Sequence, residues 1–406
     1  MRTFLASACA LLVVACGGTG DVDVDGGGGD ASPDTTPPSD GSAGDVTTTP
    51  DGAADASTDA PSDAGTFGGR LFVTQESAGI DVWDGIDALA ADTAPTFTMT
   101  SSAISGGSRG AIVVNNRLVV GPGAGGLAAF DGAKTLAAGA AASAVVPGTA
   151  FIKPISINST PIVTLITYNE KTDTLWASGS WGTDRFDSGA SITSSSTGAA
   201  LFSHAYLQLP GFAYEATGDH AFAGQISGAG LLAWNGAKSA TGSPASSFTL
   251  DQKLAAWSLA VSQDRLYAIG PDSSGTTQHE AIAVWSTISG VSAAKTPDFT
   301  ITSSIAASDY SPYVTVMGDM LMACIQSGKV LVWKGASTLS GDKAPDFTLT
   351  TQLNEPQKVV LAPVTNRLYV LDSQGVAIYS NATTGPTFVA KITTGISKPH
   401  DLVVIE

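Results

Sequence analysis

The chain contains one long sequence phrase twice. Lys329–Thr350 is KVLVWKGASTLSGDKAPDFTLT, and Gly79–Thr100 is GIDVWDGIDALAADTAPTFTMT. Both run Val-Trp-x-Gly, then a stretch of small residues, then Ala-Pro-x-Phe-Thr. A phrase that recurs near both ends of a chain indicates an architecture built from structural repeats.

From residue 70 onward the pattern occurs seven times, and each unit begins with a short apolar triplet. The first residues of these triplets are Leu71, Leu118, Leu175, Ala221, Leu266, Leu321 and Leu368. A second strand then ends near an aromatic side chain, which is Trp83, Phe130, Phe186, Trp234, Trp285, Trp333 or Tyr379. A third strand begins with Phe-Thr in four units, at Phe97, Phe248, Phe299 and Phe347.

Another apolar run precedes every triplet except the first. The six internal runs are 111–114, 162–166, 212–214, 259–261, 313–316 and 359–362. The missing run lies at the end of the chain, in Asp401–Ile405. Four short strands in a repeat of about 40–50 residues predict an all-β fold, a seven-bladed β-propeller. The C-terminal strand supplies the inner strand of the first blade, so the ring closes and no open sheet edge remains.

An aromatic side chain at the same place in each unit indicates a repeated contact between blades, because each such ring buries about 150–250 Å². A tryptophan-rich ligand platform is the functional alternative. The periodic spacing favours the core interpretation.

The last unit, NRLYVLDSQGVAIYSNATTGPTFVAKITTGISKPHDLVVIE in residues 366–406, carries a family likeness. Its R-L-Y-V-x-D, G-V-x-I-Y and P-x-x-L-V-V segments resemble the NHL and YVTN-type propeller repeats of bacterial extracytoplasmic proteins. The resemblance extends loosely over 68–406 and implies an extracytoplasmic propeller. The regular Trp-Asp and Gly-His pairs of one other propeller class and the paired glycines of kelch repeats are missing.

The N-terminus predicts export and lipidation. MRTFLASACALLVVACGG has one basic residue, an apolar run too short to span a bilayer, and Val-Val-Ala before Cys16. These residues resemble the lipobox of bacterial lipoproteins, which implies a signal peptide over 1–15 and acyl chains on Cys16. An ordinary secretory signal is the alternative. Gly17 and Gly18 follow the cysteine, and this favours the outer membrane within the cell envelope.

Residues 16–67 predict an acidic, disordered linker made of Asp, Gly, Ser, Thr and Pro, which holds the 68–406 domain away from the membrane. Asp21–Gly26 copies half of a calcium loop, but Ser32 stands where the loop needs Glu, so calcium is only an alternative and no cofactor is expected. The net charge of −17 argues against nucleic acid as a partner, because phosphate binding needs clustered basic residues.

None of the candidate catalytic motifs has the neighbouring residues that its chemistry requires. Gly106–Gly110 matches G-x-S-x-G, but an apolar strand follows where a nucleophile elbow needs a helix, so we expect a loop between blades. His204, His220, His279 and His400 have no metal-ligand spacing. Cys324 lies in an apolar run and is expected to be a buried, inert thiol.

Propellers place ligands at the central channel, so the residues that lead into the inner strands are the candidates for binding. They are Arg109, Trp257, Asp309, Tyr310, Glu355, Gln357, His400 and Asp401. The first hypothesis is a monomeric, lipid-anchored, non-catalytic binding or scaffold module with a protein or glycan partner. The alternatives are a metal-assisted hydrolase or lactonase in the channel, and a purely structural envelope protein.

The first prediction concerns the anchor. Cys16→Ser removes the acylated thiol, so the protein is expected to leave the membrane fraction and appear in the soluble fraction. Metabolic labelling with a clickable palmitate followed by cell fractionation measures both effects. The matched control is Cys9→Ser, which changes a thiol inside the cleaved segment. Label on the Cys16→Ser protein would contradict the assignment.

Overall fold

The computed structural model describes residues 68–76, 79–152, 161–179, 181–204, 211–224, 230–250, 255–272, 279–306 and 313–406. The predicted signal peptide, Cys16 and the predicted linker lie outside this part of the chain. In the described part, no helix is long and apolar enough to cross a membrane.

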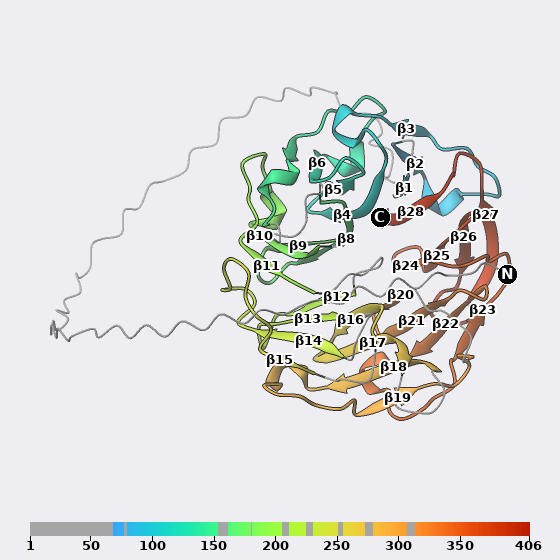
Figure 1. The fold of residues 1–406 in the computed structure, drawn as a ribbon. Coiled ribbons are helices and arrows are strands. Elements are labelled where there is room, and N and C mark those ends of the chain that lie inside the picture. The colour runs from blue at the N-terminus through green and yellow to red at the C-terminus, as the bar shows by residue number, and fades with distance from the viewer. Residues whose placement is uncertain are drawn as a thin grey trace, which may run out of the picture. The chain divides into compact units, whose positions relative to one another are not determined.

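The described residues form seven four-stranded antiparallel sheets, arranged as blades around a centre (Figure 1). The innermost strands, from blade 1 to blade 7, are β28 (Pro399–Ile405), β4 (Ser108–Val114), β8 (Val163–Asn169), β12 (Phe212–Glu215), β16 (Ser258–Ser262), β20 (Tyr313–Met317) and β24 (Lys358–Ala362). The second strands are β1 (Arg70–Gln75), β5 (Arg117–Pro122), β9 (Thr174–Gly179), β13 (His220–Gly224), β17 (Arg265–Asp272), β21 (Met320–Ile325) and β25 (Arg367–Asp372).

Two further strands complete the outer half of each blade. The third strands are β2 (Ile80–Asp84), β6 (Leu127–Asp131), β10 (Gly182–Asp187), β14 (Leu231–Asn235), β18 (His279–Ser286), β22 (Lys329–Lys334) and β26 (Gly375–Ser380). The outermost strands are β3 (Phe97–Met99), β7 (Ala144–Val146), β11 (Ala200–Phe202), β15 (Phe248–Thr249), β19 (Phe299–Ile301), β23 (Phe347–Leu349) and β27 (Thr387–Ile392). Short 3₁₀ turns join some strands, at η1 (Ile86–Ala88), η2 (Ser102–Ile104), η3 (Ala133–Thr135), η4 (Gly148–Ala150), η5 (Gly189–Ser191), η6 (Ile288–Gly290) and η7 (Ala336–Thr338).

The ring closes between the two ends of the domain. β28 pairs with β1 in an antiparallel register that matches Arg70 with Ile405 and Gln75 with Pro399. The C-terminal strand is therefore the inner strand of the first blade, and the predicted seven-bladed propeller with this closure is confirmed.

The periodic aromatic side chains are core residues. Each is almost fully buried, and each packs into a cluster formed with the preceding blade: Trp83, Phe130, Phe186, Trp234, Trp285, Trp333 and Tyr379. Trp333, for example, contacts Tyr267, Ile269 and Ile282 of blade 5. The predicted repeated contact between blades is therefore confirmed.

The recurrent phrase forms the same hydrogen bonds in each blade that contains it. The indole N–H of Trp333 donates to the carbonyl of Lys343 at 2.8 Å, and Trp83 donates to Thr93 at 2.9 Å. The residue after each of these tryptophans donates its backbone N–H to the side chain that precedes the Phe-Thr pair, as Lys334 does to Asp346 at 2.7 Å. Trp234 and Trp285 repeat the arrangement. The phrase thus fastens the Ala-Pro loop to the third strand.

Basic side chains at the edge of one blade reach carbonyls of the next. Arg265 of β17 donates to the carbonyls of Ala336 and Leu339 in blade 6, at 3.3 and 2.7 Å. The other donors to the next blade are Arg70, Arg117, Arg185 and Arg367, and His220 bonds Ser289 at the equivalent place in blade 4. The accepting carbonyls belong to the turns that follow the third strands, so these bonds satisfy turn carbonyls at the blade-to-blade interface.

The second prediction tests these clamps. Arg265→Met keeps the length of the side chain but leaves the Leu339 carbonyl without its donor, which is expected to lower the free energy of unfolding by about 1–3 kcal/mol. Urea denaturation followed by tryptophan fluorescence measures the change. Lys238→Met, at an exposed position, is the control and is expected to have little effect. Equal stabilities of the two variants would contradict the role of the clamp.

Candidate functional site

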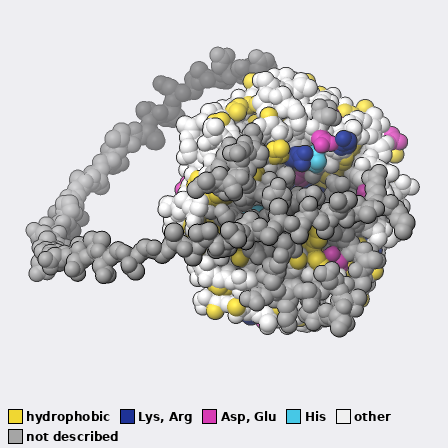
Figure 2. All heavy atoms as spheres, in the orientation of Figure 1, with side chains coloured by type: hydrophobic (Ala, Val, Ile, Leu, Met, Phe, Trp, Pro, Cys, Tyr) yellow, Lys and Arg dark blue, Asp and Glu magenta, His cyan; other side chains and the backbone are white. Residues whose placement is uncertain are grey.

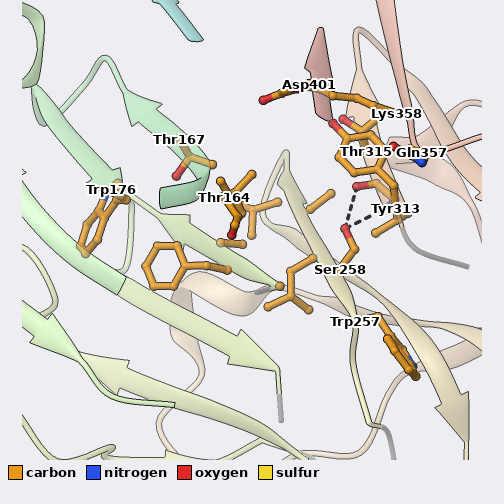
Figure 3. Close-up of a pocket in the computed structure, with 18 of the residues that line it drawn as sticks. Thr164, Thr167, Trp176, Trp257, Ser258, Tyr313, Thr315, Gln357, Lys358 and Asp401 are labelled. Carbon is orange, nitrogen blue, oxygen red and sulfur yellow. Dashed lines mark hydrogen bonds and ion pairs between the residues drawn. The ribbon is translucent and has the colours of Figure 1, made fainter. Parts of the chain in front are cut away.

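A cavity of about 820 Å³ lies at the centre of the ring, and all seven blades contribute to its lining. The inner strands are the edge strands of their sheets, so their unpaired backbone edges face this central cavity. Figure 3 shows part of the lining, with Thr167 and Trp176 on one side and Lys358 and Asp401 on the other.

Six of the eight candidates line the central cavity: Arg109, Trp257, Glu355, Gln357, His400 and Asp401. Asp309 and Tyr310 lie outside the described residues. The placement of Arg109 in a loop was wrong, because Arg109 belongs to β4. Asp401 lies in the ring-closing strand, as its apolar run indicated, and this strand, β28, also includes His400. These strands start earlier than the apolar runs suggested, since polar residues continue the same antiparallel pairing.

The G-x-S-x-G match is also placed differently from expectation. Ser108 starts β4 and pairs with Pro122, so the Ser108–Gly110 half of the motif is strand and only its two leading glycines form a turn. Gly107 has a φ of 83° and lies so close to the Glu76 carbonyl that a Cβ would be 2.0 Å from its oxygen. The glycines are therefore explained by close packing of the backbone.

Neighbouring inner strands are joined by side chains that bond backbone groups on the edge of the next strand. The hydroxyl of Ser258 in β16 accepts the N–H of Val314 in β20 at 3.1 Å. The carboxylate of Asp401 in β28 accepts the N–H of Ala111 in β4 at 2.8 Å. These side chains hold the wall of the cavity in a fixed register.

The strongest electrostatic feature of the wall is an ion pair between Lys358 of β24 and Asp401. Tyr313 of β20 lies beside the pair, and burial is the main reason that the pKa of its hydroxyl is raised. Burial lowers the pKa of Lys358, but the charges of Asp401 and Tyr313 outweigh it, so the net pKa is raised and the lysine stays charged. Asp401 thus bonds blades 7 and 2 from its own blade 1.

A second charged group lies at the edge of the cavity. Glu76 pairs with Lys398 at 3.0 Å and with Arg109 at 3.8 Å. Partial burial, followed by the charge of Arg109, lowers the pKa of His400. Figure 2 shows a group of basic, acidic and histidine side chains on a face where charged side chains are sparse.

The opposite wall is aromatic. Trp176 of β9 packs against Phe212 and Tyr214 of β12, with ring centroids 5.1 and 4.8 Å apart. Thr167 of β8 pairs directly with Trp176 in the sheet register. Sequence reasoning assigned Trp176 only to a core triplet and Tyr313 only to an inner apolar run, and it did not name Lys358. One available signal was a tryptophan in a second strand, where the other units have none.

The remaining reactive side chains lie away from the central cavity. The ring of His204 bonds the hydroxyl of Thr183, and burial lowers its pKa to about 4. Cys324 is fully buried, as expected, and burial raises the pKa of its thiol. Within the described ranges, no group of three His, Cys, Asp or Glu side chains is arranged to hold a metal ion.

Comparison with known proteins supports the fold. No protein-family model matches the sequence, and neither does any curated protein. A candidate 6-phosphogluconolactonase from Bacteroides fragilis is similar in structure, with a TM-score of 0.58 and 13% identity over 83% of this chain and 98% of that one. A protein from Lactobacillus plantarum gives 0.54 and 13% over 83% and 99%. The WD40 propeller domain of Doa1 gives 0.50 and 11% over 81% and 88%. At these identities the likeness extends to the fold alone.

The third prediction concerns the ion pair in the wall. Lys358→Met leaves the buried Asp401 carboxylate without its cation, which is expected to cost about 3–5 kcal/mol at pH 7. Because the pKa of Lys358 is raised in the folded protein, its contribution is complete below pH ~10 and is lost as the pH rises further. The difference from the wild type is therefore expected to shrink above pH ~10.

Urea titrations of the wild type and the variant between pH 7 and pH 11 test this expectation. Lys398→Met is the control, because its exposed pair with Glu76 is screened by water and contributes little. A cost for Lys358→Met that is small at pH 7, or that grows on going to pH 11, would contradict the assigned role.

Proposed function

We propose that the protein is a membrane-tethered, extracytoplasmic binding module whose ligand occupies the central cavity of the propeller. The proposal combines the lipobox-like Cys16 and acidic linker of the sequence with the cavity of the folded domain. The partner is a glycan or an extended segment of another protein, because either one can enter a central cavity that is lined by all seven blades.

The proposal rests on one contrast: the outer strands repeat from blade to blade, whereas the residues that line the cavity do not. The outer strands repeat the same packing and hydrogen bonds in most blades. The cavity lining, in contrast, has a charged wall around Lys358 and Asp401 and an aromatic wall around Trp176 and Tyr214. An asymmetric lining of this kind recognises an asymmetric ligand.

A hydrolase is the second candidate, and the structural likeness to a candidate lactonase motivates it. That reaction would draw on Glu355 and Asp401 among the described candidates. Asp401 already accepts bonds from Lys358, Ala111 and its neighbour Leu402, so its carboxylate has a structural task. Glu355 is exposed and separate from it in the chain. A binding function, in contrast, leaves the bonds of Asp401 to Lys358, Ala111 and Leu402 intact.

The fourth prediction concerns occlusion of the cavity. Gln357 is a half-buried lining residue, and Gln357→Trp is expected to narrow the cavity and lower the binding of its ligand at least tenfold. Ala137→Trp, at an exposed position in the loop after η3, is the control. Binding of the three purified full-length proteins to a glycan array and to an immobilised peptide library measures the effect.

The expected result is one class of ligand that the wild type and Ala137→Trp bind equally and Gln357→Trp does not. Binding that all three proteins share would place the ligand elsewhere on the domain and contradict the proposal. Lactone turnover that requires calcium, stops with a chelator and is lost in Glu355→Gln would favour the hydrolase instead.

A further inference from the structure

Two polar atoms on the aromatic wall of the central cavity have no hydrogen-bond partner among the described residues. They are the indole nitrogen of Trp176 and the hydroxyl oxygen of Thr167. Trp176 is 1% exposed, and both residues line the cavity. They are cross-strand neighbours in the β8–β9 pair, so their side chains extend from the same face of the sheet (Figure 3), and we refer to the two polar atoms together as the Trp176 spot.

Trp176 differs in this respect from the tryptophans of the third strands. The third-strand tryptophans Trp83, Trp234, Trp285 and Trp333 all donate to backbone carbonyls at 2.8–3.2 Å. The neighbouring tyrosines of the same wall are also satisfied, since Tyr168 bonds Asp173 and Tyr214 bonds Asp219, each at 3.0 Å. A buried donor without a partner opposes folding, so its presence next to a cavity points to a ligand atom as the partner.

The charges in the cavity argue for a neutral ligand. The two basic side chains of the lining, Lys358 and Arg109, each have a carboxylate of the protein beside them. An anionic ligand would compete with Asp401 for a lysine that is already paired and largely desolvated, and this competition lowers its affinity. The other polar lining groups are the exposed carboxylate of Glu355, which repels an anion, the half-buried imidazole of His400, and neutral hydroxyls and amides such as those of Asn169, Thr164, Thr315, Gln326 and Gln357.

The apolar groups define the shape of the ligand. The rings of Phe212 and Tyr214 pack against Trp176. A ligand whose polar group bonds the indole nitrogen therefore also needs an apolar surface that can pack against aromatic rings. A sugar ring meets both requirements, because its C–H face packs on aromatic rings while its hydroxyls donate and accept hydrogen bonds around the edge.

We propose that the central cavity binds a neutral sugar, with one ring or hydroxyl oxygen accepting the Trp176 indole N–H and an adjacent hydroxyl bonded to Thr167. This inference rests on the proposed binding function and names its ligand. The interaction is non-covalent, and each protein group keeps its proton. A peptide that uses a backbone carbonyl at the same spot is the competing occupant and is separated from the sugar by the test.

The experiment uses isothermal titration of the full chain with defined probes. The neutral probes are maltose, cellobiose, lactose and N,N′-diacetylchitobiose. The acidic probe is cellobiuronic acid, and the peptide probe is acetyl-tetra-alanine amide. We expect at least one neutral disaccharide to bind, and cellobiuronic acid and the peptide to bind at least tenfold more weakly than that sugar.

Two variants remove the unpartnered groups. Thr167→Val replaces the hydroxyl by a methyl group of the same shape, and Trp176→Phe removes the N–H but keeps an aromatic ring. Each is expected to weaken sugar binding about tenfold. Tyr369→Phe is the control, and it is expected to keep full affinity because Tyr369 lies outside the cavity lining and its hydroxyl is bonded to the Ile86 carbonyl at 3.0 Å.

Thermal melting separates a binding role from a structural one. Thr167→Val removes a hydroxyl that has no partner in the protein, so its melting temperature is expected to equal or exceed that of the wild type while its affinity falls. Tyr369→Phe is expected to show the opposite pattern, with a lower melting temperature because its bond to Ile86 is lost, and unchanged affinity.

Three results would overturn the inference: no neutral disaccharide binds the folded wild type, the peptide or the acidic sugar binds best, or Thr167→Val keeps full affinity. If binding that Gln357→Trp abolishes is found but no sugar binds, the sugar assignment alone fails and the binding function stands. If neither is found, both fail.

Discussion

A blade of this protein buries its aromatic side chain only against the blade before it, so the fold depends on a closed ring. Trp83 of the first blade has no preceding blade in sequence, and it packs instead on Tyr369 and Ile378 of the last one. That contact forms only when β28 pairs with β1 at the ends of the domain. Closure therefore completes the last blade-to-blade interface and covers the edge of β1 with β28.

Asp401 connects this closure to the central cavity. It lies in the strand that closes the ring, pairs with Lys358 of blade 7 and accepts a backbone N–H from blade 2. One carboxylate thus ties the last blade, the first and the second at the cavity wall. A residue with this task is buried and charged for structural reasons, which explains why a perturbed polar cluster in a cavity need not be catalytic.

The sequence was sufficient for the fold because the repeated features are local. The spacing of Trp83, Trp285 and Trp333 and the proline-containing loop after each of them report bonds formed within one blade. The site depends on contacts between different blades, and the spacing of the sequence repeat does not predict those contacts. Lys358 lies next to Asp401 only because blades 7 and 1 meet, and Trp176 faces the cavity only because of how blade 4 packs on blade 3.

Blade 3 shows how function can be inferred from a departure from the repeat. Four blades place a tryptophan in the third strand and use its N–H on their own loop, whereas blade 3 has Phe186 there and carries Trp176 in its second strand. The repeat gives that indole no acceptor, and an unpaired buried donor costs about 1–3 kcal/mol. A protein whose total stability is only about 5–15 kcal/mol keeps such a group where something other than folding uses it. The cavity beside Trp176 is where a ligand would supply that acceptor.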